Sequence, residues 1–135
     1  SLRSSAVKNV LDPELVVILD DYRTLPEYSE VLLSNANTKS LFGDWPINIA
    51  ATRGSAHEMS VLLRNGADVN AQGEHRYTPL HNSVEQGKLE AVQFLVANGA
   101  DLNARNSNGQ TPLDLAGILD EDLIAAYLRQ QGSSQ

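Results

Sequence analysis

The feature that most constrains this chain is an internal repeat whose period is the separation between Thr78 and Thr111. Thr78-Pro79-Leu80-His81 recurs as Thr111-Pro112-Leu113-Asp114, and Gly66-Ala67-Asp68-Val69-Asn70 recurs at the same separation as Gly99-Ala100-Asp101-Leu102-Asn103. One period before Thr78, the same register holds Trp45-Pro46-Ile47-Asn48. Because separate motifs agree on one period, the sequence predicts a stack of similar units.

Each unit has the pattern of two short helices followed by an extended turn. Thr78 is a good helix N-cap, and Pro79 suits the first helical position. Gly87 separates this helix from a second apolar run over residues 89–96, which Asn98-Gly99 ends. The repeated unit is therefore predicted to be helix–turn–helix.

The N-terminal part is less regular. Asp12-Pro13-Glu14 predicts the start of a helix, and Thr24-x-x-Glu27 has the form of a capping box that opens a second helical run. Since Asp12 lies one period before Trp45, we interpret residues 12–44 as a degenerate first repeat. Its turn chemistry is expected to have drifted, with Asn35-Ala36-Asn37 in place of the Gly-Ala-Asp motif. The pattern leaves open whether residues 1–11 add a helical turn.

These motifs resemble the ankyrin repeat family, whose Thr-Pro-Leu-His signature stands at 78–81 and whose turn motif stands at 66–70 and 99–103. The resemblance covers residues 44–132 closely and 12–43 loosely. It implies an all-α solenoid of about four helix–turn–helix units with β-turn fingers, the first unit degenerate. The single domain, 1–135, then divides into a degenerate repeat 12–44, repeats 45–77 and 78–110, and a C-terminal capping repeat 111–135.

Composition narrows the function. The 135 residues carry 10 basic and 17 acidic side chains, a net charge of −7, which disfavours nucleic acid and anionic membranes as partners. The absence of cysteine excludes disulfides and zinc–thiolate sites. We expect a monomeric, cytoplasmic protein, with the periplasm and secretion left open because the chain begins at Ser1 rather than Met. The irregular, cap-like ends favour a complete protein.

The three histidines are not expected to form a metal site. His81 belongs to the signature, and the resemblance implies that it links the loops of adjacent repeats through hydrogen bonds. His57 is expected on a solvated helix face, and His75 at an exposed finger tip. No catalytic or phosphate-binding motif is recognisable. We therefore expect no enzyme activity, no cofactor and no metal.

Three aromatic residues near the fingers allow two interpretations. Either Trp45 packs against the degenerate first repeat, or Phe42, Trp45 and Tyr77 form an exposed row of binding anchors. The second finger is also unusual, because the family prefers Asp at position 73 and Gly at position 76. Gly73 is predicted to carry the turn instead, and Arg76 to project into solvent.

The resemblance implies a module that binds a protein partner through its finger tips and the exposed, concave face of its first helices. The predicted contacts are Leu41, Phe42, Asp44, Glu74, His75, Tyr77, Ser107, Asn108 and Gln110 on the fingers, and Thr52, Arg53, Glu85 and Gln86 on the first helices. The acidic charge predicts a basic partner. Two alternatives stay open: a dedicated inhibitor or immunity protein for a basic toxic enzyme, and a structural spacer within an assembly.

Overall fold

The computed structural model describes residues 12–133 as an array of helices without strands. The elements are α2 (Pro13–Tyr22), η1 (Pro26–Tyr28), α3 (Pro46–Arg53), α4 (Ala56–Arg64), η2 (Glu74–Arg76), α5 (Pro79–Glu85), α6 (Leu89–Ala97), α7 (Pro112–Ile118) and α8 (Asp122–Ser133), where η marks a 3₁₀ turn. The predicted all-α solenoid is confirmed. The question of a helical turn in residues 1–11 lies outside the described residues.

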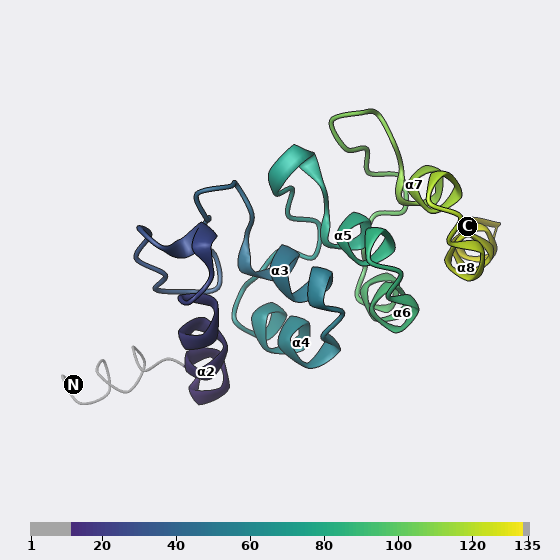
Figure 1. Ribbon diagram of the computed structural model, residues 1–135. Helices are drawn as coiled ribbons and strands as arrows, with labels where there is room; N and C mark the ends of the chain where they lie inside the picture. Colours follow the sequence, from purple (N-terminus) through teal and green to yellow (C-terminus); the bar gives the residue numbers. More distant parts are fainter. Residues whose placement is uncertain (1–11, 134–135) are drawn as a thin grey trace.

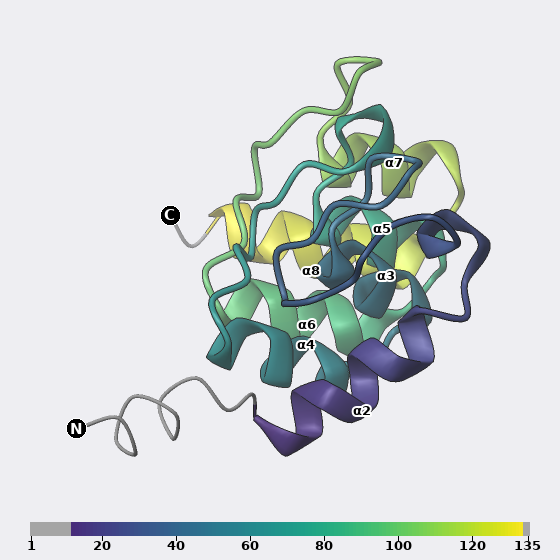
Figure 2. The ribbon, with the colours of Figure 1, turned by 90° about the vertical axis from the view of Figure 1, so that its left-hand side faces the viewer.

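The helices form two rows (Figure 1). In the first row, α3 packs on α5 and α5 on α7; in the second, α2 packs on α4, α4 on α6 and α6 on α8. The loops that lead into the first-row helices project to one side as fingers, and Figure 2 shows them following one another along the array. Among residues 12–133, no helix is both long and apolar enough to cross a membrane.

The first-row helices begin as their signatures predict. The side chains of Thr78 and Thr111 accept hydrogen bonds from backbone amides at 3.3 and 3.1 Å, and each threonine is followed by proline at the first helical position. Trp45 has no side-chain oxygen to offer. There, Asn48 Oδ1 accepts from the Trp45 amide at 3.0 Å, so α3 keeps half of the capping arrangement.

The prediction of a second helix after Thr24 is wrong. The chain there forms only the 3₁₀ turn η1, and Thr24 Oγ1 donates to the carbonyl oxygen of Asp21 at 2.7 Å. The physical reason is Pro26, because the residue before a proline avoids helical geometry. Leu25 is accordingly extended, with φ −76° and ψ 142°.

The degenerate unit therefore supplies a single α-helix, and that helix stands in the second row. The connection from α2 to α3 runs over residues 23–45, which is much longer than the connection from α4 to α5 over residues 65–78. The one-period spacing of Asp12 and Trp45 thus pairs the starts of two helices that occupy different rows. An N-cap followed by proline marks a helix start in either row.

The first turn keeps one feature of the later turns although its sequence differs from theirs. Asn35 Oδ1 accepts from the amide of Asn37 at 2.8 Å, and Asp68 Oδ1 accepts from the amide of Asn70 at 2.9 Å one period later. Both are Asx turns, in which a side-chain oxygen binds the amide two residues on. Asparagine and aspartate side chains both form this turn, so its backbone geometry is kept.

A buried tyrosine attaches α2 to the array. The side chain of Tyr22 is fully buried, its hydroxyl donates to Glu58 Oε1 on α4, and burial together with that carboxylate raises the Tyr22 pKa. The Arg53 guanidinium lies 4.8 Å from the centre of the Tyr22 ring and pairs with Asp21 at 2.6 Å. These contacts close the N-terminal end of the core.

Candidate functional site

The fingers are joined to one another by hydrogen bonds from one repeated position. In each finger, the backbone amide at this position donates to the segment that precedes it. The three bonds run from Leu41 N to Glu27 O at 2.8 Å, from Glu74 N to Asp44 Oδ1 at 3.0 Å, and from Ser107 N to His75 O at 2.8 Å. The finger side is therefore a connected surface rather than three independent loops.

The turn of the second finger differs from its prediction. His75 and Arg76 both adopt left-handed backbone conformations, with φ 57° and 60°, whereas Gly43 occupies the position of Arg76 one period earlier with φ 96°. Gly73 has φ −92° and does not carry the turn, so that expectation is wrong. Gly73 is required for space, because a Cβ there would overlap Asp44 Oδ1. Arg76 is exposed, as expected.

Six of the thirteen predicted contact residues line one hollow of about 240 Å³ between the first two fingers and the ends of α3 and α5. We call it the acidic hollow; its lining consists of Asp44, Thr52, Glu74, His75, Tyr77, Asn82 and Glu85. The two fingers and the two helices thus contribute to a single concave feature, as the periodic register predicts.

The electrostatics of the acidic hollow favour a cation. Its carboxylates are Asp44, Glu74 and Glu85, and within residues 12–133 none of them forms an ion pair with lysine or arginine. The Tyr77 hydroxyl donates to Glu85 Oε2 at 2.9 Å, and burial together with this carboxylate raises the pKa of Tyr77 to about 12. His75 Nε2 lies 3.5 Å from Glu74 Oε1.

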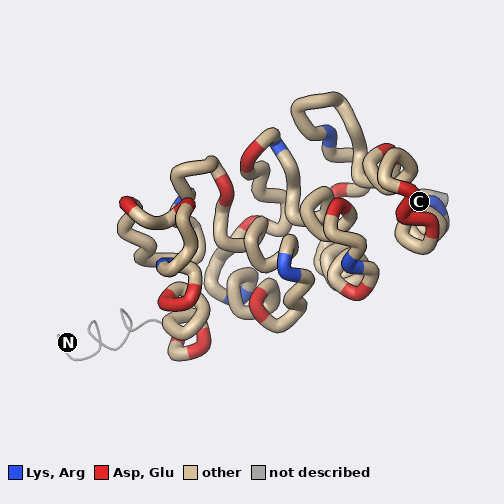
Figure 3. The backbone as a smooth tube through the Cα atoms, in the orientation of Figure 1, with Lys and Arg blue, Asp and Glu red and all other residues tan. Residues whose placement is uncertain are grey.

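A further carboxyl group, Glu27, lies behind the first finger. Burial raises the pKa of Glu27, the Ser40 hydroxyl opposes this by a hydrogen bond, and the charges of Asp44 and Glu74 raise it again. Burial is the largest cause of this shift, and the charges of Asp44 and Glu74 add to it. Figure 3 shows acidic residues on the fingers and on both rows of helices.

Buried side chains of the first row hold the fingers in place. His81 Nε2 donates to the carbonyl oxygen of Gln110 at 2.8 Å, and one period earlier Asn48 Nδ2 donates to the carbonyl oxygen of Tyr77 at 3.2 Å. The loop-linking role that the resemblance implied for His81 is present. Burial lowers the pKa of His81, although the bond to Gln110 acts in the opposite direction.

The other predicted contact residues lie outside the acidic hollow. Arg53 is engaged by Asp21, Glu58 and the Tyr22 ring, so its guanidinium serves the attachment of α2. The remaining six are Leu41, Phe42, Gln86, Ser107, Asn108 and Gln110, and all of these except the half-buried Gln110 are exposed. The third finger therefore flanks the hollow without lining it.

Sequence reasoning missed three residues on this face. Asn82 lines the hollow and accepts a hydrogen bond from Asn48 Nδ2 at 2.9 Å. The signal in the sequence was a polar residue at a position where the preceding repeat has Ile49. Ile118 and Leu119 are 62% and 42% exposed at the positions equivalent to Glu85 and Gln86. An apolar pair where the other repeats carry polar residues was the signal for these two.

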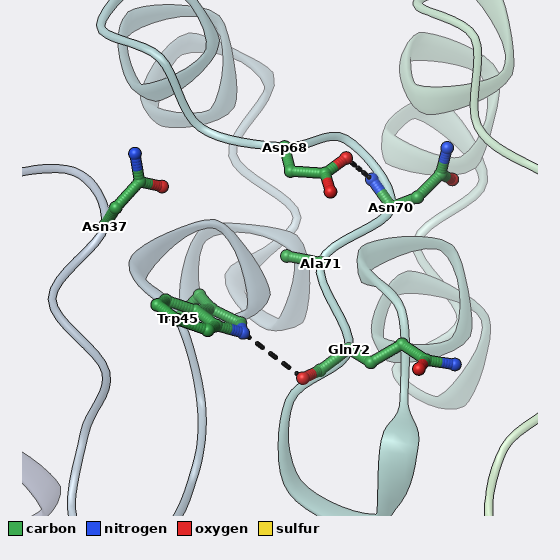
Figure 4. Close-up of a pocket in the computed structure, with 6 residues that line it drawn as sticks. All are labelled: Asn37, Trp45, Asp68, Asn70, Ala71 and Gln72. Carbon is green, nitrogen blue, oxygen red and sulfur yellow. Dashed lines mark hydrogen bonds between the residues drawn. The ribbon is translucent and has the colours of Figure 1, made fainter.

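A second hollow of about 500 Å³ lies beside Trp45. Its lining consists of Asn37, Trp45, Asp68, Asn70, Ala71 and Gln72 (Figure 4). The indole Nε1 donates to the carbonyl oxygen of Gln72 at 3.2 Å, and Lys39 Nζ lies 5.5 Å from the ring centre. Trp45 therefore lies between Lys39 of the first unit and Gln72 of the second finger. The contact with Lys39 favours the interpretation in which Trp45 packs against the degenerate first repeat.

The three aromatic residues near the fingers belong to different surface features. Trp45 lines the second hollow, Tyr77 lines the acidic hollow, and Phe42 lines neither although it is 55% exposed. The first two turns, beside the second hollow, are joined differently from the next pair. Asn37 Nδ2 donates to the carbonyl oxygen of Gly66, whereas one period later Asn70 Oδ1 accepts a backbone amide.

Comparisons with known proteins agree with the fold. Residues 62–116 match the family model described as ankyrin repeats (many copies). A putative ankyrin repeat protein of Rickettsia bellii (strain RML369-C) is 42% identical to this chain over 41 residues. That segment covers 30% of this chain and 17% of the relative, so the similarity is confined to a small part of the longer protein.

Proposed function

Because residues 62–116 of this chain are ankyrin repeats, which generally serve as protein–protein interaction modules, we propose that the protein binds a partner protein through its finger tips and the concave face of its first helices. The observation that carries this proposal is the convergence of six predicted contact residues on the acidic hollow. Residues from two fingers and two helices meet there in one folded arrangement.

The scaffold favours recognition by a surface that is already formed. The hydrogen bonds between fingers and the buried links from Asn48 and His81 hold the contact side chains in position before a partner arrives. A surface fixed in advance loses less conformational entropy on binding. The bound partner is therefore expected to find the hollow in the shape described above.

The charge of the surface favours a basic partner. Asp44, Glu74 and Glu85 form no ion pair with lysine or arginine within the described residues, and the whole chain carries a net charge of −7. Complementary charge raises association rates more than it raises affinity, and salt screens it. We therefore expect association to slow as ionic strength rises, and Glu74→Lys/Glu85→Lys to abolish this dependence.

Affinity capture from a lysate of the source organism tests the proposal. The baits are the wild type, a Glu74→Ala/Tyr77→Ala variant, and a Glu90→Ala/Gln93→Ala control on the exposed face of α6. We expect one protein to be retained by the wild type and the control and lost with the Glu74→Ala/Tyr77→Ala bait. Equal capture by all three baits would refute the finger surface as the site.

A second candidate function is inhibition of a basic enzyme. The observation that favours it is the same group of three carboxylates, none of which pairs with lysine or arginine within residues 12–133 and which could cover a cationic active site. The two functions separate on one measurement with the captured partner. An inhibitor binds at nanomolar strength and abolishes the partner's activity at a one-to-one ratio, whereas an interaction module binds more weakly and leaves the activity intact.

A further inference from the structure

We propose, building on the function above, that the partner supplies an extended segment in which a lysine or arginine and a large apolar residue stand about three positions apart. The basic side chain enters the acidic hollow, and the apolar side chain covers Ile118 and Leu119. The proposal rests on two features of the same face, one charged and one apolar, and on the distance between them.

The charged half of the surface is a concave site rather than a set of dispersed carboxylates. Asp44 and Glu74 come from different fingers and are joined by a 3.0 Å hydrogen bond, while Glu85 comes from α5. Tyr77 forms a half-buried wall and donates to Glu85, which fixes that carboxylate. Arginine suits such a site better than lysine, because its planar group donates to several oxygens at once.

The apolar half lies one repeat further along. Ile118 ends α7 and Leu119 follows it, at the positions that Glu85 and Gln86 occupy at the end of α5. Their side chains are 62% and 42% exposed, and they are the exposed large apolar residues at the ends of the described first-row helices. Adjacent exposed apolar side chains of this kind favour contact with another apolar surface.

The spacing follows from the packing of the helices. The helices α5 and α7 are direct neighbours, and packed helices lie about 8–10 Å apart. An extended chain advances about 3.3 Å per residue. A partner segment that crosses the first row therefore spans one repeat with about three residues.

Synthetic peptides test this spacing without knowledge of the partner. Fluorescein-labelled peptides with Gly/Ser flanks carry arginine and leucine three positions apart in both orders, and the tighter order is taken forward. Comparison peptides carry Glu for Arg, Ser for Leu, or the same two residues seven positions apart. Fluorescence anisotropy with the full chain should give a Kd at least ten-fold lower for the three-position peptide than for each comparison peptide.

Variants assign each half of the peptide to its half of the surface. Glu74→Gln/Glu85→Gln should remove the affinity that the peptide gains from its arginine and keep the affinity that it gains from its leucine. Ile118→Ser/Leu119→Ser should do the reverse. The controls are Glu90→Gln on α6 and Leu123→Ser on α8, which change an exposed acidic and an exposed apolar residue of the second row. Circular dichroism checks that each variant is folded.

Several outcomes would overturn the inference. One is an equal Kd for all peptides. Another is an affinity contribution of arginine that persists in Glu74→Gln/Glu85→Gln, or one of leucine that persists in Ile118→Ser/Leu119→Ser. A dimer of the wild type, detected by sedimentation equilibrium and dispersed by Ile118→Ser/Leu119→Ser, would assign the apolar pair to a second copy of this chain. If one of these results is found while the Glu74→Ala/Tyr77→Ala bait still loses the partner in affinity capture, the proposed segment is refuted and the proposed function stands. If that bait captures the partner as well as the wild type does, the proposed function is refuted.

Discussion

His81 Nε2 lies 2.8 Å from the carbonyl oxygen of Gln110, so a buried imidazole on α5 holds the base of the following finger. A carbonyl oxygen only accepts, so Nε2 carries the proton. Nδ1 is then free to accept from the backbone amide of Thr78, which lies 3.2 Å away. Thr78 Oγ1 also lies 2.8 Å from Nδ1, so the neutral imidazole is held on both of its ring nitrogens.

This arrangement predicts a loss of stability at mildly acidic pH. Burial lowers the pKa of His81 below its ordinary value of 6.5, so the unfolded chain binds this proton more readily than the folded chain. The stability contributed by neutral His81 is therefore present above about pH 6.5 and is lost as pH falls from there toward the folded-state pKa. The slope from one such group is at most about 1.4 kcal/mol per pH unit.

Urea unfolding between pH 7.5 and 5.5 measures this dependence. The variant His81→Asn should show a flatter pH dependence, because Asn48 fills the equivalent position one period earlier without titrating. The difference in slope, rather than the absolute stability, is the readout. Parallel curves for the wild type and the variant would contradict the assignment.

Two glycine substitutions should shift stability in opposite directions. In Gly73→Ala, the new Cβ overlaps Asp44 Oδ1 and lies 2.8 Å from Asn48 Oδ1, so we expect a loss of about 1–3 kcal/mol. In Gly117→Ala, no heavy atom lies within 4 Å of the new Cβ and the site is inside α7, so a gain of about 0.5–1 kcal/mol is expected. Chemical denaturation measures both, and equal shifts would refute the packing described at Gly73.

A glycine in place of Arg76, whose backbone is left-handed, should stabilise the second finger. Arg76 has φ 60° at a position where Gly43 stands one period earlier, so Arg76→Gly is expected to add up to about 1 kcal/mol. Arg76→Ala keeps a Cβ and should add nothing. Asp120→Gly should give a smaller gain, because aspartate tolerates its φ of 57° better. A destabilised Arg76→Gly variant would show that the guanidinium, rather than the backbone, matters here.

Removal of one buried hydroxyl should weaken the attachment of α2. Tyr22→Phe loses the bond to the Glu58 carboxylate, at an expected cost of about 1.5–3 kcal/mol in the free energy of unfolding. Tyr127→Phe on α8 is the control, since its hydroxyl makes no hydrogen bond within residues 12–133, and it should change stability by less than about 0.5 kcal/mol. Similar costs for both variants would show that the Glu58 bond contributes little.

The helices from α3 onward could be predicted because their signals are local. Thr78 caps its helix, a proline follows it, and Gly87 ends the turn between the two helices with φ 66°. The row of α2 could not be predicted in this way. Its start has the same N-cap and proline as a first-row helix, and only packing against α4 assigns it to the second row.

The difference between local signals and packing between helices also explains which predicted contact residues meet in the acidic hollow. The register of the repeat identifies positions that share a face, so six of the seven residues of the acidic hollow could be named without the structure. Arg53 was assigned to the binding face by register alone. Its partners Asp21 and Tyr22 belong to α2, so its structural role depended on a helix whose position the sequence pattern misassigned.

The three hydrogen bonds donated by the repeated amide position all run in one direction. Each donor belongs to the later finger and each acceptor to the earlier one, and the first acceptor is the carbonyl oxygen of Glu27 in η1. Each of these bonds restrains the donor segment and the acceptor segment alike, so a displacement of the middle finger would strain the bonds on both of its sides. The two end members, the segment at Glu27 and the third finger, are each held by one bond of this series.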